Sequence, residues 1–231
     1  MIKAYHFKLL ILTSLFLWSS CKKKDKWKQP TSVKFKMDIN RTPGLGGNLS
    51  FTGGNIKLAY FTFNGNREQG GDIYFNKTYN PLLVIFDPNN VVPEWNFEIP
   101  QGSYSQIKIS FKTFDEGDQN IIVTGSYKNS TNNVTYPIRF EFSVDEAYEV
   151  VSKTSSGSTN IILDKNVAST AEITMDPVYW FQTVTTAMLD TAQVAAVGGA
   201  QTILINDTIN SNIYEEVKDR VHDDVSRVIF N

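Results

Sequence analysis

The chain has 231 residues, of which 41% are hydrophobic and 20% are charged, and its formal net charge is −2. This composition is ordinary for a globular protein and allows one sizeable core. The charge is unevenly distributed: residues 29–231 carry 15 Lys and Arg against 23 Asp and Glu. An acidic body of this kind argues against a nucleic-acid partner, because phosphate contact requires clustered cations.

Residues 1–20 predict a signal peptide of the lipoprotein type. A positively charged start is followed by an apolar run at 9–18, which is too short to span a bilayer but suits a cleaved export signal. Ser19 and Ser20 then precede Cys21, the only cysteine of the chain. We therefore predict cleavage before Cys21 and lipidation of its thiol. The alternative is an ordinary secretory signal followed by a spare cysteine.

Residues 21–31 predict a tether that starts at the lipidated cysteine. The segment contains five lysines and no apolar periodicity, and its cations are suited to anionic lipid head groups. The alternative is a solvated linker. Membrane lipid, reached through acylated Cys21, is therefore the expected partner. The expected location is the bacterial envelope, anchored to the outer membrane and facing either the periplasm or the surface.

Residues 32–175 show the period-two alternation of β-strands. Val33, Phe35 and Met37 alternate with polar residues, and 134–142 alternate in the same way. The segment 56–63 is apolar on both sides, which predicts a central strand. About ten short strands separated by turn residues predict a mainly β domain, specifically an antiparallel Greek-key-like β-sandwich.

Residues 176–231 predict a small C-terminal helical subdomain packed on the sandwich. Asp176 before Pro177 is typical of a capped helix start. The Ala-rich segment 186–197 predicts a second helix that ends at two glycines. A third amphipathic helix has an apolar stripe, formed by Ile213, Val217, Val221, Val225 and Val228.

One segment resembles a known group of proteins. Residues 99–111 follow the form I-P-x-G-x-Y-x-x-I-x-I-x-F, and the chain has a Cys-Lys-Lys-Lys sequence at Cys21. With the segment 49–56, these features resemble Bacteroidota-type lipoproteins that carry uncharacterised β-sandwich domains. The resemblance covers about half of the chain and implies a sandwich on a lipid tether, with no catalytic residues. Before the cysteine, Trp18 departs from the small or aliphatic residue that such lipoproteins usually have at this position. Lysines also replace the acidic run that many surface-displayed relatives carry.

The chemistry available to the exported part is limited. His222 is its only histidine, and we expect it on the solvent face of the last helix rather than in a catalytic site. We expect no enzyme activity and no cofactor. An acidic loop with Asp115, Glu116 and Asp118 is a candidate calcium site, and the alternative is a loop that faces water.

Aromatic residues suggest one binding hypothesis. Trp95, Tyr104 and Trp180 would stack on sugar rings if their faces were exposed, and the alternative is that all three belong to the core. The sequence thus predicts an envelope-anchored lipoprotein with a non-enzymatic binding or structural role. The alternatives are a glycan-binding accessory lipoprotein of an outer-membrane uptake system, or a fimbria or adhesin subunit that exchanges strands.

Overall fold

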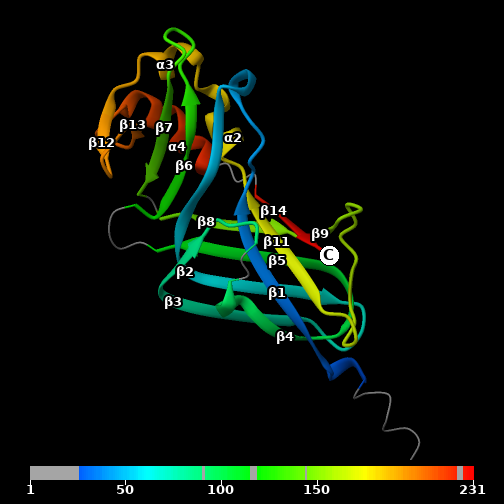
Figure 1. Cartoon of the computed structure of the whole chain (residues 1–231). Coiled ribbons are helices and arrows are strands. Elements are labelled where there is room, and N and C mark those ends of the chain that lie inside the picture. The colour runs from blue at the N-terminus through cyan, green and yellow to red at the C-terminus, as the bar shows by residue number, and fades with distance from the viewer. Residues whose placement is uncertain (1–25, 90–91, 115–118, 144, 223–225) are drawn as a thin grey trace, which may run out of the picture.

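Strands form most of the described chain and assemble into two sheets (Figure 1). The computed structural model describes residues 26–231, apart from 90–91, 115–118, 144 and 223–225. The two sheets face each other over part of their area, so the mainly β sandwich expected from the sequence is confirmed.

The smaller sheet has five strands among the described residues, in the order β4-β1-β11-β14-β9. Their bounds are Asn96–Pro100 for β4, Pro30–Ile39 for β1, Ser169–Met175 for β11, Arg227–Phe230 for β14 and Lys153–Thr154 for β9. β1 is antiparallel to β4 but parallel to β11, and β14 is parallel to β9. The expected all-antiparallel pairing is therefore wrong for these neighbours. Parallel partners need long crossovers, and most of the larger sheet lies between β1 and β11 in the sequence.

In the described part of the chain the larger sheet has nine strands. Seven of them follow the order β10-β5-β2-β6-β7-β13-β12, and β3 is added beside β2 and β8 beside β5. The bounds are Ile161–Leu163 for β10, Gly102–Thr113 for β5, Leu49–Arg67 for β2, Ile121–Lys128 for β6, Thr135–Phe142 for β7, Ala200–Ile205 for β13, Val194–Val197 for β12, Ile73–Ile85 for β3 and Ala147–Val151 for β8. All pairs in this sheet are antiparallel except β13 with β7.

A bulge explains why β2 is apolar on both sides in the sequence. Ile56 and Leu58 are fully buried, and so are Phe61 and Phe63, although the two pairs have opposite parity. The register with β5 shifts between Leu58 and Tyr60. The extra residue of a bulge turns the following side chains to the other face. Both pairs therefore reach the core from one face of the same long strand.

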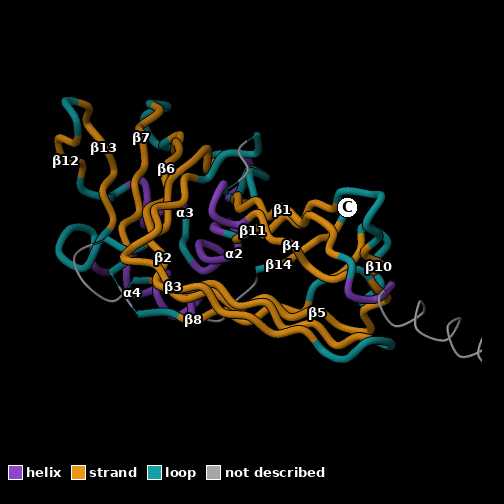
Figure 2. The backbone as a smooth tube through the Cα atoms, turned by 90° about the horizontal axis from the view of Figure 1, so that it is seen from below, coloured by secondary structure: helices purple, strands orange, loops and turns teal. Residues whose placement is uncertain are grey.

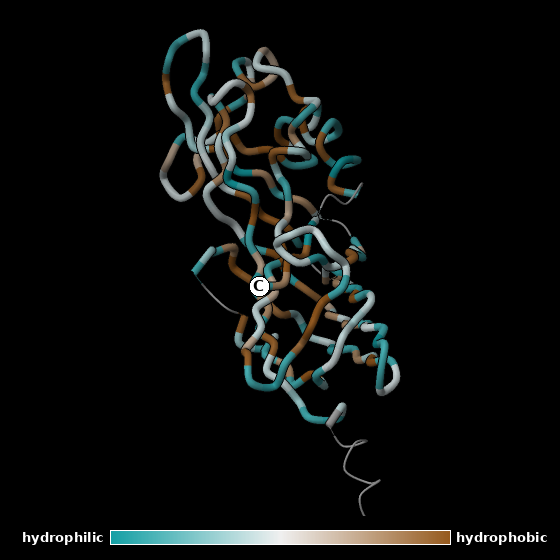
Figure 3. The backbone as a smooth tube through the Cα atoms, turned by 90° about the vertical axis from the view of Figure 1, so that its right-hand side faces the viewer, coloured by the Kyte–Doolittle hydropathy of each residue, from teal (hydrophilic) through white to brown (hydrophobic). Residues whose placement is uncertain are grey.

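The long strand β2 connects two parts of the molecule, one built around β6 and the other around β3 and β5 (Figures 1 and 2). Its first part pairs with β6, and its second part pairs with β3 and β5. Helices cover the first part, since Phe51 lies 5.1 Å from Phe181, ring centroid to centroid. The smaller sheet covers the second part, where Phe35 lies 5.0 Å from Phe61. The molecule as a whole is elongated (Figure 3).

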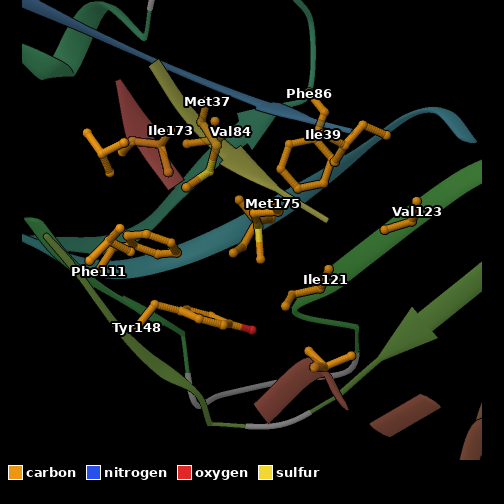
Figure 4. Close-up of a cluster of buried hydrophobic side chains, with 14 of the residues drawn as sticks. Met37, Ile39, Val84, Phe86, Phe111, Ile121, Val123, Tyr148, Ile173 and Met175 are labelled. Atoms are coloured by element: carbon orange, nitrogen blue, oxygen red, sulfur yellow. The ribbon is translucent and has the colours of Figure 1, made fainter. Parts of the chain in front are cut away.

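Figure 4 shows the buried side chains that join the two sheets. The smaller sheet contributes from β1 and β11, and the larger sheet contributes from β3, β5, β6 and β8. The cluster includes Met37, Ile39, Val84, Phe111, Ile121, Val123, Tyr148, Ile173 and Met175. All of them belong to one continuous core that extends into both parts of the molecule. Burial of a side chain of this size contributes roughly 1.5–3 kcal/mol.

The C-terminal quarter contains short helices, as expected, and it also adds strands to both sheets. It contains α2 (Pro177–Trp180), the 3-10 helix η4 (Phe181–Thr183), α3 (Thr186–Asp190), β12, β13, α4 (Ser211–His222) and β14. The capped start at Asp176 is confirmed, because its side chain accepts a hydrogen bond from the Tyr179 amide at 3.1 Å. β14 then inserts between β11 and β9.

Two helix predictions in this quarter are wrong in extent. The Ala-rich segment is helical only to Asp190, and Gly198 and Gly199, both with positive φ, turn the β12–β13 hairpin. Helix α4 keeps the buried stripe to Val221, but Val228 belongs to β14. Val225 lies outside the described residues.

The remaining described helical turns are short. They are η1 (Lys26–Lys28) before β1, η2 (Leu45–Gly47) before β2 and η3 (Pro93–Trp95) before β4. Turn η1 stands at one end of the elongated molecule, and β12 stands at the other (Figure 1).

Candidate functional site

The predicted lipidation site and the predicted calcium loop lie outside the described residues. Cys21 precedes the first described residue, and Asp115, Glu116 and Asp118 fall in the gap before β6. Asn120, which follows that gap, is buried. Within the described part of the chain, no three His, Cys, Asp or Glu side chains come together as metal ligands.

The three aromatic residues considered for glycan stacking are core residues, so the stacking hypothesis is wrong for them and the core alternative is confirmed. Trp95 and Tyr104 are 0% exposed and Trp180 is 2% exposed. Trp95 packs at 4.9 Å on Phe61, and Trp180 packs at 6.5 Å on Phe140. Their burial leaves no ring face open to a sugar.

His222 lies at the end of α4, as expected, with its side chain 41% exposed. Its Nδ1 contacts the Glu146 carboxylate, and its ring meets the edge of Phe142 at 5.8 Å. This partly exposed polar contact fastens α4 to the segment before β8. Its contribution to stability is modest.

The most distinctive polar arrangement lies where the chain enters the fold. The guanidinium of Arg67, at the end of β2, donates to the carbonyl of Trp27 at 2.8 Å and to that of Gln101 at 3.2 Å. It also donates to Gly70 and Gly71, each at 2.7 Å. Since no other side chain offers so many donors in one fixed fork, Arg67 fixes the position of η1 against the β2–β3 turn.

Tyr104 supports this arrangement from the inside. Its hydroxyl donates to the Pro100 carbonyl at 2.6 Å, and its ring lies 6.0 Å from the Arg67 guanidinium carbon. Burial raises the pKa of Tyr104 to about 12, and the charge of Arg67 acts in the opposite direction. The neutral phenol is therefore a permanent donor that holds the turn between β4 and β5.

Two shallow hollows open at this same end and share the side chain of Ile162. The first has a volume of about 220 Å³ and is bordered by Trp27, Gly102 and Leu163, among others. The second, of about 310 Å³, is bordered by Val167 and Phe230, among others. Figure 2 shows β10, which carries Ile162, beside the helical turn η1 at this end.

Ile162 and Val167 are unusually exposed for aliphatic residues, at 76% and 61%. The loop that carries Val167 is anchored to the start of β1, because the Thr31 hydroxyl donates to the Asp164 carbonyl at 2.9 Å. Trp27 is half-buried on the other side of Ile162. We call Trp27, Ile162 and Val167 the apolar tip. It is the candidate functional surface.

The sequence did not point to the apolar tip. Ile162 stands between two buried residues, Ile161 and Leu163, and the triplet is equally apolar throughout. Only the pairing of β10 with β5 decides that the middle side chain points outward. The signal that was present in the sequence is the position of Trp27, six residues after Cys21.

Comparison with known protein families, with characterised protein sequences and with solved structures finds no match for this chain. In the part of the chain that the structure describes, no helix has the length and apolar character needed to cross a bilayer.

Proposed function

We propose that this chain is a bacterial envelope lipoprotein, held to the outer membrane by acylated Cys21, whose body has a non-enzymatic binding or structural role. The observation that carries the proposal is the apolar run 9–18, followed by Ser19, Ser20 and the only cysteine of the chain. Two or more acyl chains on one cysteine would hold the protein stably on a bilayer, since each buried methylene contributes about 0.8 kcal/mol.

The way in which the fold begins supports this proposal. The first described turn, η1, starts at Lys26, five residues after Cys21. Arg67 then holds the Trp27 carbonyl at 2.8 Å. An anchor at Cys21 would therefore act on the body through a very short tether.

The test is the intact mass of the protein isolated from bacterial membranes. We expect a chain that begins at Cys21 and carries the added mass of acyl groups. Cys21→Ser should lose the acyl mass and keep the signal. Ser19→Ala, which retains a small residue, should be processed like the original chain. An intact Met1 with a free thiol at position 21 would contradict the proposal.

A strand-exchanging fimbria or adhesin subunit is the second candidate, and the edge strand β3 favours it. Among the described strands only β2 pairs with β3. Tyr74, Leu83 and Ile85 on β3 are 68%, 54% and 61% exposed. The same strand also contains Lys77 and Pro81. Lysine and proline on an edge strand act against unspecific pairing with a strand of another chain. Light scattering tests this candidate: a body that stays monomeric at every concentration would exclude self-assembly through β3.

A further inference from the structure

We propose that the apolar tip of the body rests on the lipid surface, so that the long axis of the molecule stands away from the membrane with β12 at the distal end. The inference deepens the proposed function and rests on the acyl anchor at Cys21. It adds the orientation of the body and names a protein surface that contacts lipid.

The first argument is the length of chain between anchor and tip. Trp27 follows Cys21 by six positions, and even a fully extended chain spans only about 3.5 Å per residue, or roughly 20 Å here. Arg67 prevents the body from swinging freely about this point, because it binds the Trp27, Gln101, Gly70 and Gly71 carbonyls together. The tip must therefore stay within this distance of the acylated residue.

The second argument is the chemistry of the tip. Trp27 is an amphipathic ring of the kind found at membrane interfaces, and beside it stand the exposed side chains of Ile162 and Val167. Two aliphatic residues this exposed, close to one half-buried tryptophan, mark an interaction surface better than a single exposed residue does. The hollows on either side of Ile162 are shallow and give a small ligand little enclosure, whereas a lipid surface needs only protruding apolar groups.

The third argument is charge. Lys28 and Lys165 are exposed at this end, and four further lysines lie between Cys21 and Trp27. Against these cations stand Asp25 in the tether and Asp164, Glu68 and Asp72 in the body, of which Asp72 accepts a hydrogen bond from the Arg67 amide at 3.1 Å. With the tether included, the end is net positive, whereas residues 29–231 are net negative. Anionic head groups would attract this end and repel the rest of the body.

The main rival as a lipid-facing surface is β3, on which Tyr74, Leu83 and Ile85 are exposed. Contact through these residues would lay the molecule on its side. The two orientations place different residues in the head-group region, so site-specific labels can separate them.

The experiment uses the full acylated protein in vesicles of phosphatidylethanolamine and phosphatidylglycerol. Since acylation blocks Cys21, a cysteine introduced elsewhere is the only free thiol and takes one fluorophore. Three variants carry the label: Ile162→Cys at the tip, Leu83→Cys on β3 and Val194→Cys on β12. All three positions are exposed in the structure. Quenching of each label by a lipid-borne nitroxide is then measured.

We expect quenching at position 162 to exceed that at 83 and 194 several-fold. The double variant Ile162→Asp/Val167→Asp, labelled at Lys165→Cys, should lose most of the quenching seen with Lys165→Cys alone, while its circular dichroism stays unchanged. Equal quenching at all three positions, or the strongest quenching at 83, would overturn the inference.

Failure of the anchor gives a different result. If mass spectrometry finds no acyl group and the protein does not float with the vesicles, the proposed function fails. If the acyl mass is present, the protein floats and position 162 still remains unquenched, only the orientation is wrong.

Discussion

Arg67 joins three chain segments through one guanidinium group, which donates to four backbone carbonyls. Hydrogen bonds from a charged donor are stronger than neutral ones. We expect Arg67→Ala to lower the free energy of unfolding by about 2 kcal/mol, less than a sum over four bonds because water reaches the freed carbonyls. Urea unfolding measures the loss.

Arg67→Lys is the informative comparison for this prediction. The ammonium group is a compact donor without the planar fork, so it reaches only part of the set and should recover less than half of the loss. Complete recovery by lysine would show that charge alone, rather than the shape of the guanidinium, holds η1 in place.

Asp190, at the end of α3, is a second residue on which several segments converge. Its carboxylate accepts from the Tyr127 hydroxyl at 2.8 Å, from the Ser130 amide at 2.8 Å and from the Ser130 and Thr131 hydroxyls. These hydrogen bonds, the one from the Ser130 side chain first, lower the pKa of Asp190 below its ordinary value of 3.8. The ionised carboxylate thus ties the β6–β7 loop to α3.

This pKa shift predicts a dependence of stability on acid. A group with a lowered folded-state pKa stabilises the fold fully above its unfolded pKa, and the contribution is lost as the pH falls through the folded pKa. We therefore expect the urea midpoint of the original chain to fall below about pH 4. Asp190→Asn should start lower at pH 7 and show a smaller acid-dependent fall. A parallel decline of both proteins would contradict the role of Asp190.

At the scale of elements, the pairing of β2 with β6 depends on close backbone approach. An added Cβ at Gly125 would lie 1.9 Å from the Ser50 carbonyl oxygen. Because this oxygen belongs to the backbone, a change of side-chain rotamer cannot relieve the clash. Gly125→Ala should destabilise the fold by about 3 kcal/mol or more, as overpacking at a rigid site does.

Gly53→Ala is the matched control in the same strand pair. Its added Cβ would meet its nearest atom, Thr124 Oγ1, at 3.8 Å, which is ordinary contact. We expect a neutral effect or a gain of about 0.5 kcal/mol from reduced freedom of the unfolded chain. If both variants unfold at the same urea concentration, the close approach at Gly125 is not what sets this pairing.

Strands were predictable from the sequence where one face is buried and apolar residues alternate without a bulge. Val33, Phe35 and Met37 alternate in the sequence and are buried in β1 as expected. The β12 strand was missed because Ala195 and Ala196 have high helix propensity, and pairing with β13 overrides it. β14 was missed because Val228 continues the helical spacing by coincidence.

The candidate site was predictable only in part. The export signal expected up to Cys21 is a linear pattern of residues, whereas the apolar tip exists because β10, η1 and the loop with Val167 meet in space. Likewise, Trp95 could equally be exposed or buried from its type alone, and the packing of two layers decides it. Residue type sets what a side chain can do, but only the pairing of strands sets where it points.

For the whole molecule, the C-terminal quarter contributes strands to both sheets, and this affects the cooperativity of unfolding. β14 lies between β11 and β9, while β13 pairs with β7 in the other sheet. Removal of residues 176–231 would therefore open both sheets and uncover Phe51 and Phe140, which now pack on Phe181. A loss of this extent is large against the roughly 5–15 kcal/mol by which domains are usually stable.

We therefore expect a chain that ends at Met175 to be unfolded or aggregated, as measured by circular dichroism and limited proteolysis. Because the missing part contributes two strands to one sheet and one to the other, co-expression with 176–231 should restore a soluble, protease-resistant complex. A truncated chain that keeps native-like strand content and unfolds cooperatively would show instead that residues 32–175 are an independent sandwich, with the C-terminal quarter only packed on it.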